Sequence, residues 1–138
     1  MISRMHLLLG VGAAAALLAT AGVAPATPSG TVSLRLGGGD SVGANRACGA
    51  SGRFTSYRTG DRVYFAGQVT PAPPQGSKVA ILVRICLDGK WKYGREQTAT
   101  TRPNGAFRGS FEVNAPSKCF VQASYKKGKS ARAYFHVR

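Results

Sequence analysis

The 138-residue chain has few of the residues that perform acid–base or nucleophilic catalysis. It contains five Asp and Glu residues against 19 Lys and Arg, and beyond residue 26 its only histidine is His136. Nucleophilic hydrolysis needs a base beside the nucleophile, and a zinc site needs several nitrogen or sulfur ligands. Asp61 and Asp88 lie at expected turns, while Glu96 and Glu112 lie at outward positions beside basic residues. We therefore expect no enzyme, no metal site and no cofactor.

Residues 1–26 have the composition of a secretory signal peptide. Arg4 precedes the uncharged run 7–24, and Ala24-Pro25-Ala26 supplies the small residues that a signal peptidase needs, so we expect cleavage after Ala26. An uncleaved membrane anchor is the alternative, because the apolar run approaches the roughly 20 residues that span a bilayer. The run is rich in Ala and Gly, which favours cleavage. The expected product is secreted and has no membrane span.

The chain is strongly basic. Cleavage of the leader would remove only Arg4, so the formal charge would fall from +14 to +13. Such an imbalance favours association with polyanions and is silent about the fold. For an exported protein the polyanions are teichoic acids, anionic lipid head groups, acidic polysaccharides and extracellular nucleic acid. A basic surface without a dedicated ligand is the alternative.

The remainder of the chain alternates between short strand-like segments and turns. Residues 27–52 are expected to form one strand, TVSLRL, and a Gly-rich loop, because the residues after Leu36 are too polar to pack. Residues 53–138 are expected to form the folded core. A strand is predicted over Lys78–Leu87; it is apolar on both faces and is therefore expected to be central in its sheet, and an Asp88-Gly89 hairpin turn follows it. After that turn, Trp91, Tyr93, Arg95 and Gln97 are expected to share one face.

About seven short strands, with turns every 8 to 12 residues, predict an all-β fold, a single antiparallel β-sandwich. The runs GDRVYFAGQVTP, KVAILVRICLDGKW, TTRPNGAFRGSFEV and CFVQASYKKGKSARAYFHV resemble the immunoglobulin-like domains of exported bacterial proteins, particularly those of actinobacteria. The resemblance covers residues 60–137. It implies an immunoglobulin-like sandwich, it supplies no catalytic residues, and cysteines are not part of that family's general pattern.

Three cysteines, Cys48, Cys86 and Cys119, predict one disulfide and one unpaired thiol in an oxidising compartment. The residues alone leave three pairings open. In the sandwich that the resemblance implies, the third and sixth strands pair, which favours a disulfide between Cys86 and Cys119 and leaves Cys48 unpaired. The two residues have opposite parity with respect to the expected core, so this pairing requires a bulge or a core that uses the Leu82 face. The odd cysteine is expected either to be a buried thiol or to form an intermolecular disulfide.

Two groups of side chains are candidates for binding. The first combines aromatic rings with cations, as carbohydrate and nucleic-acid sites do; it consists of Trp91, Lys92, Tyr93 and Arg95. The second is a basic hairpin tip; it consists of Lys126, Lys127, Lys129 and Arg132. The structural alternatives are that Trp91 is a core or rim residue and that the lysines form a solvated turn.

The function expected from the sequence is a secreted, basic, immunoglobulin-like binding or structural module that associates with an anionic envelope or extracellular polymer. An alternative of another class is a secreted inhibitor that presents Trp91-Lys92-Tyr93 to a partner protein. This tripeptide is similar to the Trp-Arg-Tyr of small streptomycete α-amylase inhibitors, whose four-cysteine framework is absent here. A membrane-active toxin is a third class, for which the chain offers no amphipathic helix.

Overall fold

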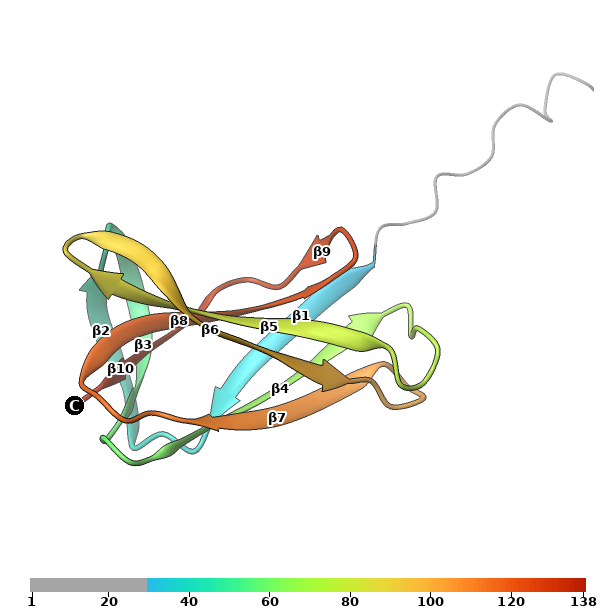
Figure 1. Cartoon of the computed structure of the whole chain (residues 1–138), viewed down its shortest axis with the longest axis horizontal. Helices are drawn as coiled ribbons and strands as arrows, with labels where there is room; N and C mark the ends of the chain where they lie inside the picture. The colour runs from blue at the N-terminus through green and yellow to red at the C-terminus, as the bar shows by residue number, and fades with distance from the viewer. Residues whose placement is uncertain (1–29) are drawn as a thin grey trace, which may run out of the picture.

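The computed structural model describes residues 30–138, and the expected signal peptide lies outside them. All elements in this range are strands, packed as two sheets (Figure 1). No helix in the described range is long and apolar enough to cross a membrane. The ten strands are β1 (Thr31–Gly37), β2 (Ser41–Ala47), β3 (Ala50–Tyr57), β4 (Arg62–Thr70), β5 (Lys78–Leu87), β6 (Lys90–Thr100), β7 (Ala106–Glu112), β8 (Ser117–Tyr125), β9 (Gly128–Lys129) and β10 (Ala133–Val137).

The strands are divided into a small and a large sheet. The small sheet has the order β1-β4-β7, and the large sheet has the order β2-β3-β10-β8-β5-β6, with β9 paired to β8. Every pair is antiparallel except β10 with β3, which is parallel. The predicted all-β sandwich is confirmed, as is the central position of β5, which lies between β6 and β8.

The segment predicted to be a Gly-rich loop contains β2, so that prediction is wrong. All of β2 from Ser41 to Ala44 is exposed, and the strand exists because its backbone pairs with β3 along its whole length. An edge strand of this kind needs no apolar residues to pack, and its composition therefore resembles that of a loop. The expected boundary at residue 53 falls inside β3.

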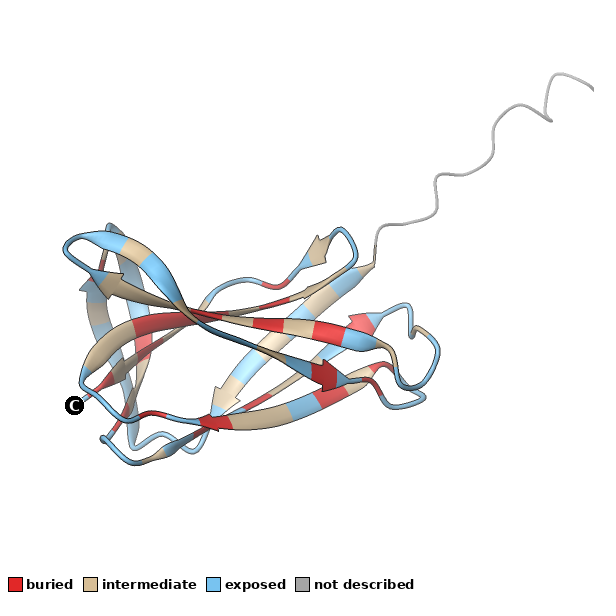
Figure 2. Cartoon of the chain, in the orientation of Figure 1, coloured by how far each residue is buried: buried red, intermediate tan, exposed pale blue. Residues whose placement is uncertain are grey.

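The main core lies between the two sheets, where buried residues alternate with exposed ones along each strand (Figure 2). In β4, Val63, Phe65 and Val69 are buried, Gly67 lies on the same face, and the residues of opposite parity point to the other side of the sheet. Two Phe rings in the small sheet lie over glycines of the neighbouring strand, because Phe65 pairs with Gly109 and Gly67 pairs with Phe107. A side chain on either glycine would meet that ring, so the small sheet depends on both.

A second, smaller core covers the outer face of the large sheet. Phe54 and Phe120 are 1% and 3% exposed there, outside the main core. Phe54 stacks on Tyr134 with ring centroids 5.1 Å apart, and Trp91 meets Phe120 edge-on at 4.8 Å. We call Phe54, Trp91, Phe120 and Tyr134 the aromatic cluster. It connects the β2–β3 hairpin to the β5–β6 hairpin.

The predicted disulfide between Cys86 and Cys119 is wrong. Cys48 bonds to Cys86, with 5.8 Å between their Cα atoms, and Cys119 is the free, buried thiol. The reason is register: Cys119 pairs with Ile85, so its side chain shares the core face with Ile85, while Cys86 faces the other side of the sheet. No bulge between β5 and β8 restores the parity. Cys48, in the turn between β2 and β3, reaches Cys86 on the outer face.

Candidate functional site

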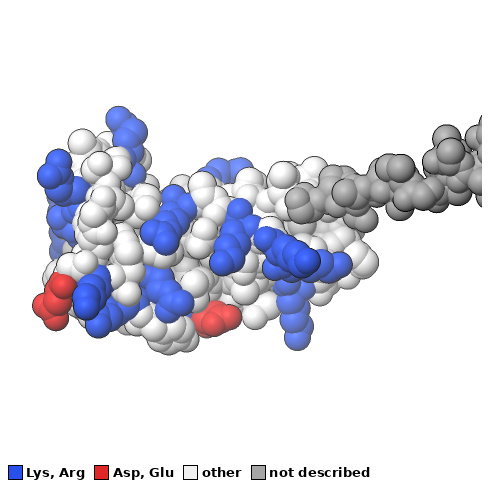
Figure 3. Space-filling model, turned by 90° about the horizontal axis from the view of Figure 1, so that it is seen from above, with Lys and Arg blue, Asp and Glu red and all other residues white. Residues whose placement is uncertain are grey.

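Most cationic side chains of the described region lack an acidic partner. The two ion pairs between residues 30 and 138 both use Asp40, which contacts Arg58 and Arg138 at 3.2 Å each. On the face of the molecule shown in Figure 3, Lys and Arg side chains are spread over the surface, with few acidic groups between them. Their positive charge is therefore available to an anionic partner.

The four residues of the first predicted group do not form one surface. Trp91 pairs with Cys86 and Tyr93 with Arg84, but the register shifts at the next step, and Arg95 pairs with Val83. Gly94 is the extra residue of this bulge, where a side chain would lie 2.9 Å from the carbonyl oxygen of Val83. Trp91 and Tyr93 therefore face outward, whereas Arg95 turns to the other face, 5.5 Å from the Phe111 ring centroid. The expected shared face is wrong.

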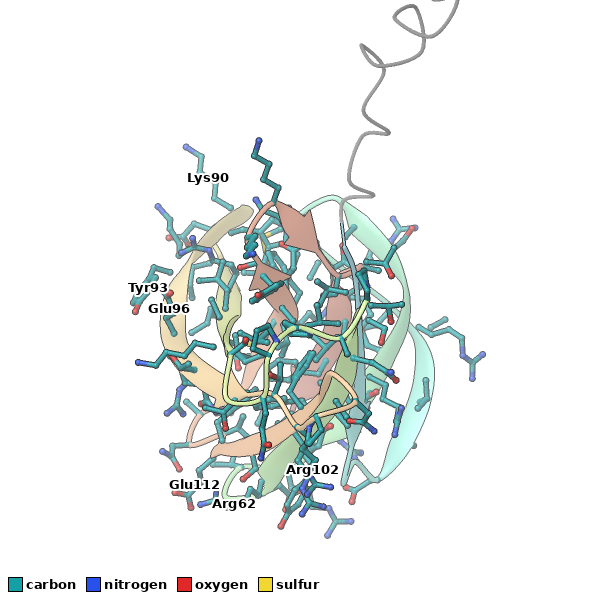
Figure 4. All side chains as sticks on the ribbon, turned by 90° about the vertical axis from the view of Figure 1, so that its right-hand side faces the viewer. Arg62, Lys90, Tyr93, Glu96, Arg102 and Glu112 are labelled. Carbon is teal, nitrogen blue, oxygen red and sulfur yellow. A yellow bond between two sulfur atoms is a disulfide. The ribbon has the colours of Figure 1, made fainter. Side chains whose placement is uncertain are left out.

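Trp91 is a rim residue of the aromatic cluster. Its ring is half-buried against Phe120 and lies 6.1 Å from Tyr134, which confirms the structural alternative stated for it. Tyr93 is 63% exposed, and the Arg84 guanidinium lies 5.4 Å from its ring centroid. Figure 4 shows Tyr93 projecting from the surface on the same side as Glu96.

The second predicted group is also divided. Lys126, Lys127 and Lys129 form the tip between β8 and β9, which we call the lysine tip, and the Lys126 ammonium lies 5.5 Å from the Tyr125 ring. Arg132 instead lies 4.3 Å over Phe120, in the aromatic cluster. Since β8 runs antiparallel to β5, the lysine tip lies beside the start of β5, whereas Trp91 lies beside its end. The lysine tip and Trp91 are therefore at opposite ends of the large sheet, whereas Arg132 lies at the same end as Trp91.

A cationic surface that was not predicted from the sequence lies on the outer face of the small sheet. Register places Arg35 of β1 and Arg108 of β7 on either side of Ala66 in β4. These residues and Tyr64 line an open hollow of 530 Å³. An adjoining hollow of 230 Å³ shares both arginines and adds Arg102.

The carboxylate of Glu112 belongs to the residue that pairs across the strands with Arg62, at one end of this surface. Arg62 donates a hydrogen bond to the Ser110 hydroxyl at 2.9 Å and is the cross-strand partner of Glu112. Arg62, Arg102 and Glu112 lie along the same side of the molecule in Figure 4. We call Arg35, Arg62, Arg102 and Arg108 the arginine face. Each of the four is exposed, as the alternation of polar and apolar residues in the sequence could have indicated. That they lie together follows from the strand order, which the sequence alone does not give.

Three described groups have shifted pKa values, and each shift has a local cause. Burial raises the pKa of the Cys119 thiol and raises that of Tyr57 to about 12, with a smaller contribution from Asp61 to the latter. Burial lowers the pKa of His136, as do the charges of Lys118 and Arg138. Residues 30–138 contain no cluster of three His, Cys, Asp or Glu side chains that could hold a metal ion.

The chemistry of the described surface is suited to binding anions. Guanidinium groups bind phosphate or carboxylate oxygens through two parallel hydrogen bonds. Tyr64, 53% exposed beside the arginine face, offers a ring for stacking. Comparison of the chain with known protein families and with curated proteins finds no match.

Proposed function

We propose that the protein is an exported, immunoglobulin-like module that adheres to an anionic polymer through its cationic surface. One observation carries this proposal. Of the 18 Lys and Arg residues in the described range, which excludes only Arg4, Arg58 and Arg138 alone pair with a carboxylate. Cations without acidic partners attract polyanions and release their counterions on contact, which gives affinity without requiring a catalytic site.

The strand order supports the immunoglobulin-like part of the proposal. Immunoglobulin sandwiches pair strands A, B and E in one sheet and strands C, F and G, with C′ added in variable domains, in the other. In the small sheet, β1, β4 and β7 correspond to A, B and E. In the large sheet, the neighbouring strands β6, β5, β8 and β10 correspond to C′, C, F and G. The β2–β3 hairpin is then an addition between the first two strands of the small sheet.

The disulfide supports export. Cys48 and Cys86 form a structural crosslink, and such crosslinks persist in oxidising compartments. This agrees with the expected leader at residues 1–26, whose removal would leave the cationic domain. N-terminal sequencing of the protein recovered from the medium of an expressing bacterium tests export, and the expected first residue is Thr27.

Chromatography tests adhesion. We expect the purified protein to bind heparin resin at about 0.15 M salt and to elute only as salt is raised, because screening weakens exposed charges. A neutral dextran resin is the control for adsorption unrelated to charge. Passage through heparin at about 0.15 M salt with the unbound fraction would sink the proposal.

The geometry does not favour the inhibitor alternative. A recognition tripeptide would present its three side chains to one partner, but the Trp91 ring packs against Phe120. Lys92 is the cross-strand partner of Ile85 and so lies on the other face from Trp91 and Tyr93. We therefore propose no second function.

A further inference from the structure

We infer that the arginine face, together with Tyr64, is a binding site for single-stranded nucleic acid. This inference rests on the proposed function and deepens it by naming the surface and the ligand class. It concerns residues that the sequence analysis did not single out as a site. Four arguments carry it: the position of the arginines, their chemistry, the exposed ring, and the width of the sheet.

The arginines converge on a small floor. Arg35 and Arg108 are cross-strand partners of Ala66 on its two sides, so two strand spacings place their Cα atoms roughly 10 Å apart. The short side chain of Ala66 leaves the space between them open, and the hollow of 530 Å³ is the result. Arg102 lines the adjoining hollow and extends the positive charge along the sheet.

The cations of this face are all arginines. An arginine guanidinium presents a rigid planar fork that matches two oxygens of a phosphate, whereas a lysine ammonium acts as a flexible point charge. The lysine tip at the end of β8 offers only such flexible point charges. A site that holds successive phosphodiester groups in position is better served by the arginine face.

Tyr64 adds a ring next to these cations. It lies two residues from Ala66 along β4, between the small cross-strand neighbours Gly37 and Ser110. Gly38 packs against the edge of the ring, because a side chain at Gly38 would meet the Tyr64 ring carbon Cδ2 at 2.7 Å. Proteins that bind single strands without sequence preference combine a cationic groove with rings on which bases stack. A polymer of phosphate without rings would leave Tyr64 unused.

The width of the sheet favours a single strand over a duplex. The small sheet has three strands and therefore spans two strand spacings, roughly 10 Å. A single strand lies along such a surface with its bases unstacked and free to reach Tyr64. In a duplex the bases are stacked on one another, and their faces are not available to a tyrosine ring.

Fluorescence anisotropy with a labelled oligothymidylate of about twelve nucleotides tests the site. We expect Arg35→Ala/Arg108→Ala to weaken binding and to reduce the slope of log affinity against log salt by about 1.4, which is two phosphate contacts at about 0.7 each. Tyr64→Ala is expected to weaken binding at least about fivefold. Lys126→Ala/Lys127→Ala is the matched control, since it removes the same charge elsewhere. All these side chains are exposed, and thermal unfolding of each variant verifies folding.

An abasic oligonucleotide of equal length separates the contribution of the ring from that of the phosphates. It is expected to bind at least about fivefold more weakly than oligothymidylate and to be insensitive to Tyr64→Ala. Equal binding of both probes would overturn the assignment to nucleic acid in favour of a phosphate backbone alone. Loss of binding in the lysine variant but not in the arginine variant would overturn the assignment of the face.

The same experiment distinguishes failure of this inference from failure of the proposed function. Binding to heparin without binding to either oligonucleotide rejects nucleic acid as the ligand and leaves polyanion adhesion standing. Absence of binding to heparin and to both oligonucleotides at about 0.15 M salt rejects both.

Discussion

Cys119 lies directly across from Ile85 on neighbouring strands of the large sheet, and its thiol shares the core with that isoleucine side chain. The residue is 3% exposed and its thiol donates a hydrogen bond to the Ser117 hydroxyl at 3.3 Å. Burial raises the thiol pKa and outweighs the opposing effect of that hydrogen bond. The reactive species, the thiolate, is therefore both scarce and inaccessible.

We expect Cys119 to resist alkylation in the native protein and to react readily after denaturation. Mass spectrometry after iodoacetamide treatment, with and without guanidinium, measures the difference. Because the thiol is inside, we also expect no disulfide-linked dimer on a non-reducing gel. Rapid native labelling, or a linked dimer that disappears in Cys119→Ala, would contradict the burial.

The Cys48–Cys86 disulfide is expected to contribute substantially to stability. It joins the β2–β3 hairpin to the end of β5, whereas the backbone pairing of β3 with the rest of the large sheet is limited to three positions with β10. For a sequence separation of 38, chain entropy predicts that Cys48→Ala/Cys86→Ala lowers the free energy of unfolding by about 3 to 4 kcal/mol. Guanidinium unfolding measures this loss.

Reduction provides the control for this variant. Dithiothreitol should lower the unfolding midpoint of the wild-type protein towards that of the double variant and should leave the double variant unchanged. A double variant as stable as the wild type would mean that the aromatic cluster and the pairing of β3 with β10 hold the hairpin without the disulfide. In that case Phe120→Ala would be the destabilising change, by about 3 to 5 kcal/mol.

The strands that form the main core were predictable because burial imposes a period of two on their residues. Lys78–Leu87 and its hairpin turn show this pattern, and the structure places a strand there. The bulge at Gly94 was not predictable, because nothing in the residues of β6 marks the position of a single extra residue. That residue nevertheless moves every later side chain of β6 to the opposite face. The disulfide was missed for a different reason: the β2–β3 hairpin, which brings Cys48 to Cys86, was predicted to be a loop, and the opposite parity of Cys86 and Cys119 was attributed to a bulge that β5 and β8 do not have.

The candidate site was less predictable than the fold. Arg35 and Arg108 could each be assigned to outward strand positions, but they are separated by most of the chain and meet only because β1, β4 and β7 are neighbours. Trp91 and Arg95 are close in the sequence and were therefore predicted to form one binding surface, but the bulge places them on opposite faces of β6. Pairing between distant strands is nonlocal information that a period-two pattern does not contain.

The bulge at Gly94 is expected to need glycine. A β-carbon there would lie 2.9 Å from the Val83 carbonyl oxygen and 3.0 Å from Cγ1 of Ile85, so the backbone has to shift. We expect Gly94→Ala to lower the free energy of unfolding by about 1 to 3 kcal/mol. Guanidinium unfolding measures the change.

Gly43→Ala is the matched control for that substitution. Gly43 lies in the edge strand β2, and a β-carbon there would meet no atom within 4 Å. The change is expected to stay within about 0.5 kcal/mol of the wild type, as surface substitutions usually do. Equal effects of the two substitutions would show that loss of glycine in a strand, and not crowding at the bulge, sets the cost.

The buried phenol of Tyr57 is expected to cause a loss of stability in alkaline solution. Its hydroxyl donates a hydrogen bond to the Gly37 carbonyl oxygen at 2.8 Å, and burial, with Asp61, raises its pKa from 10.0 to about 12. The folded protein therefore keeps this proton at pH values where the unfolded chain releases it. The stabilising contribution is complete below about pH 10 and disappears as the pH rises through about 12.

Tyr57→Phe isolates this effect. The variant is expected to be about 1 kcal/mol less stable at neutral pH, because the Gly37 carbonyl loses its donor. Its stability should then fall less steeply than that of the wild type between about pH 10 and pH 12, since no buried phenol remains to ionise. Urea unfolding across this range measures the difference, and Tyr64→Phe, which alters an exposed ring, should keep the wild-type slope. Parallel alkaline curves for wild type and Tyr57→Phe would show that the phenol buried in the core does not control alkaline unfolding.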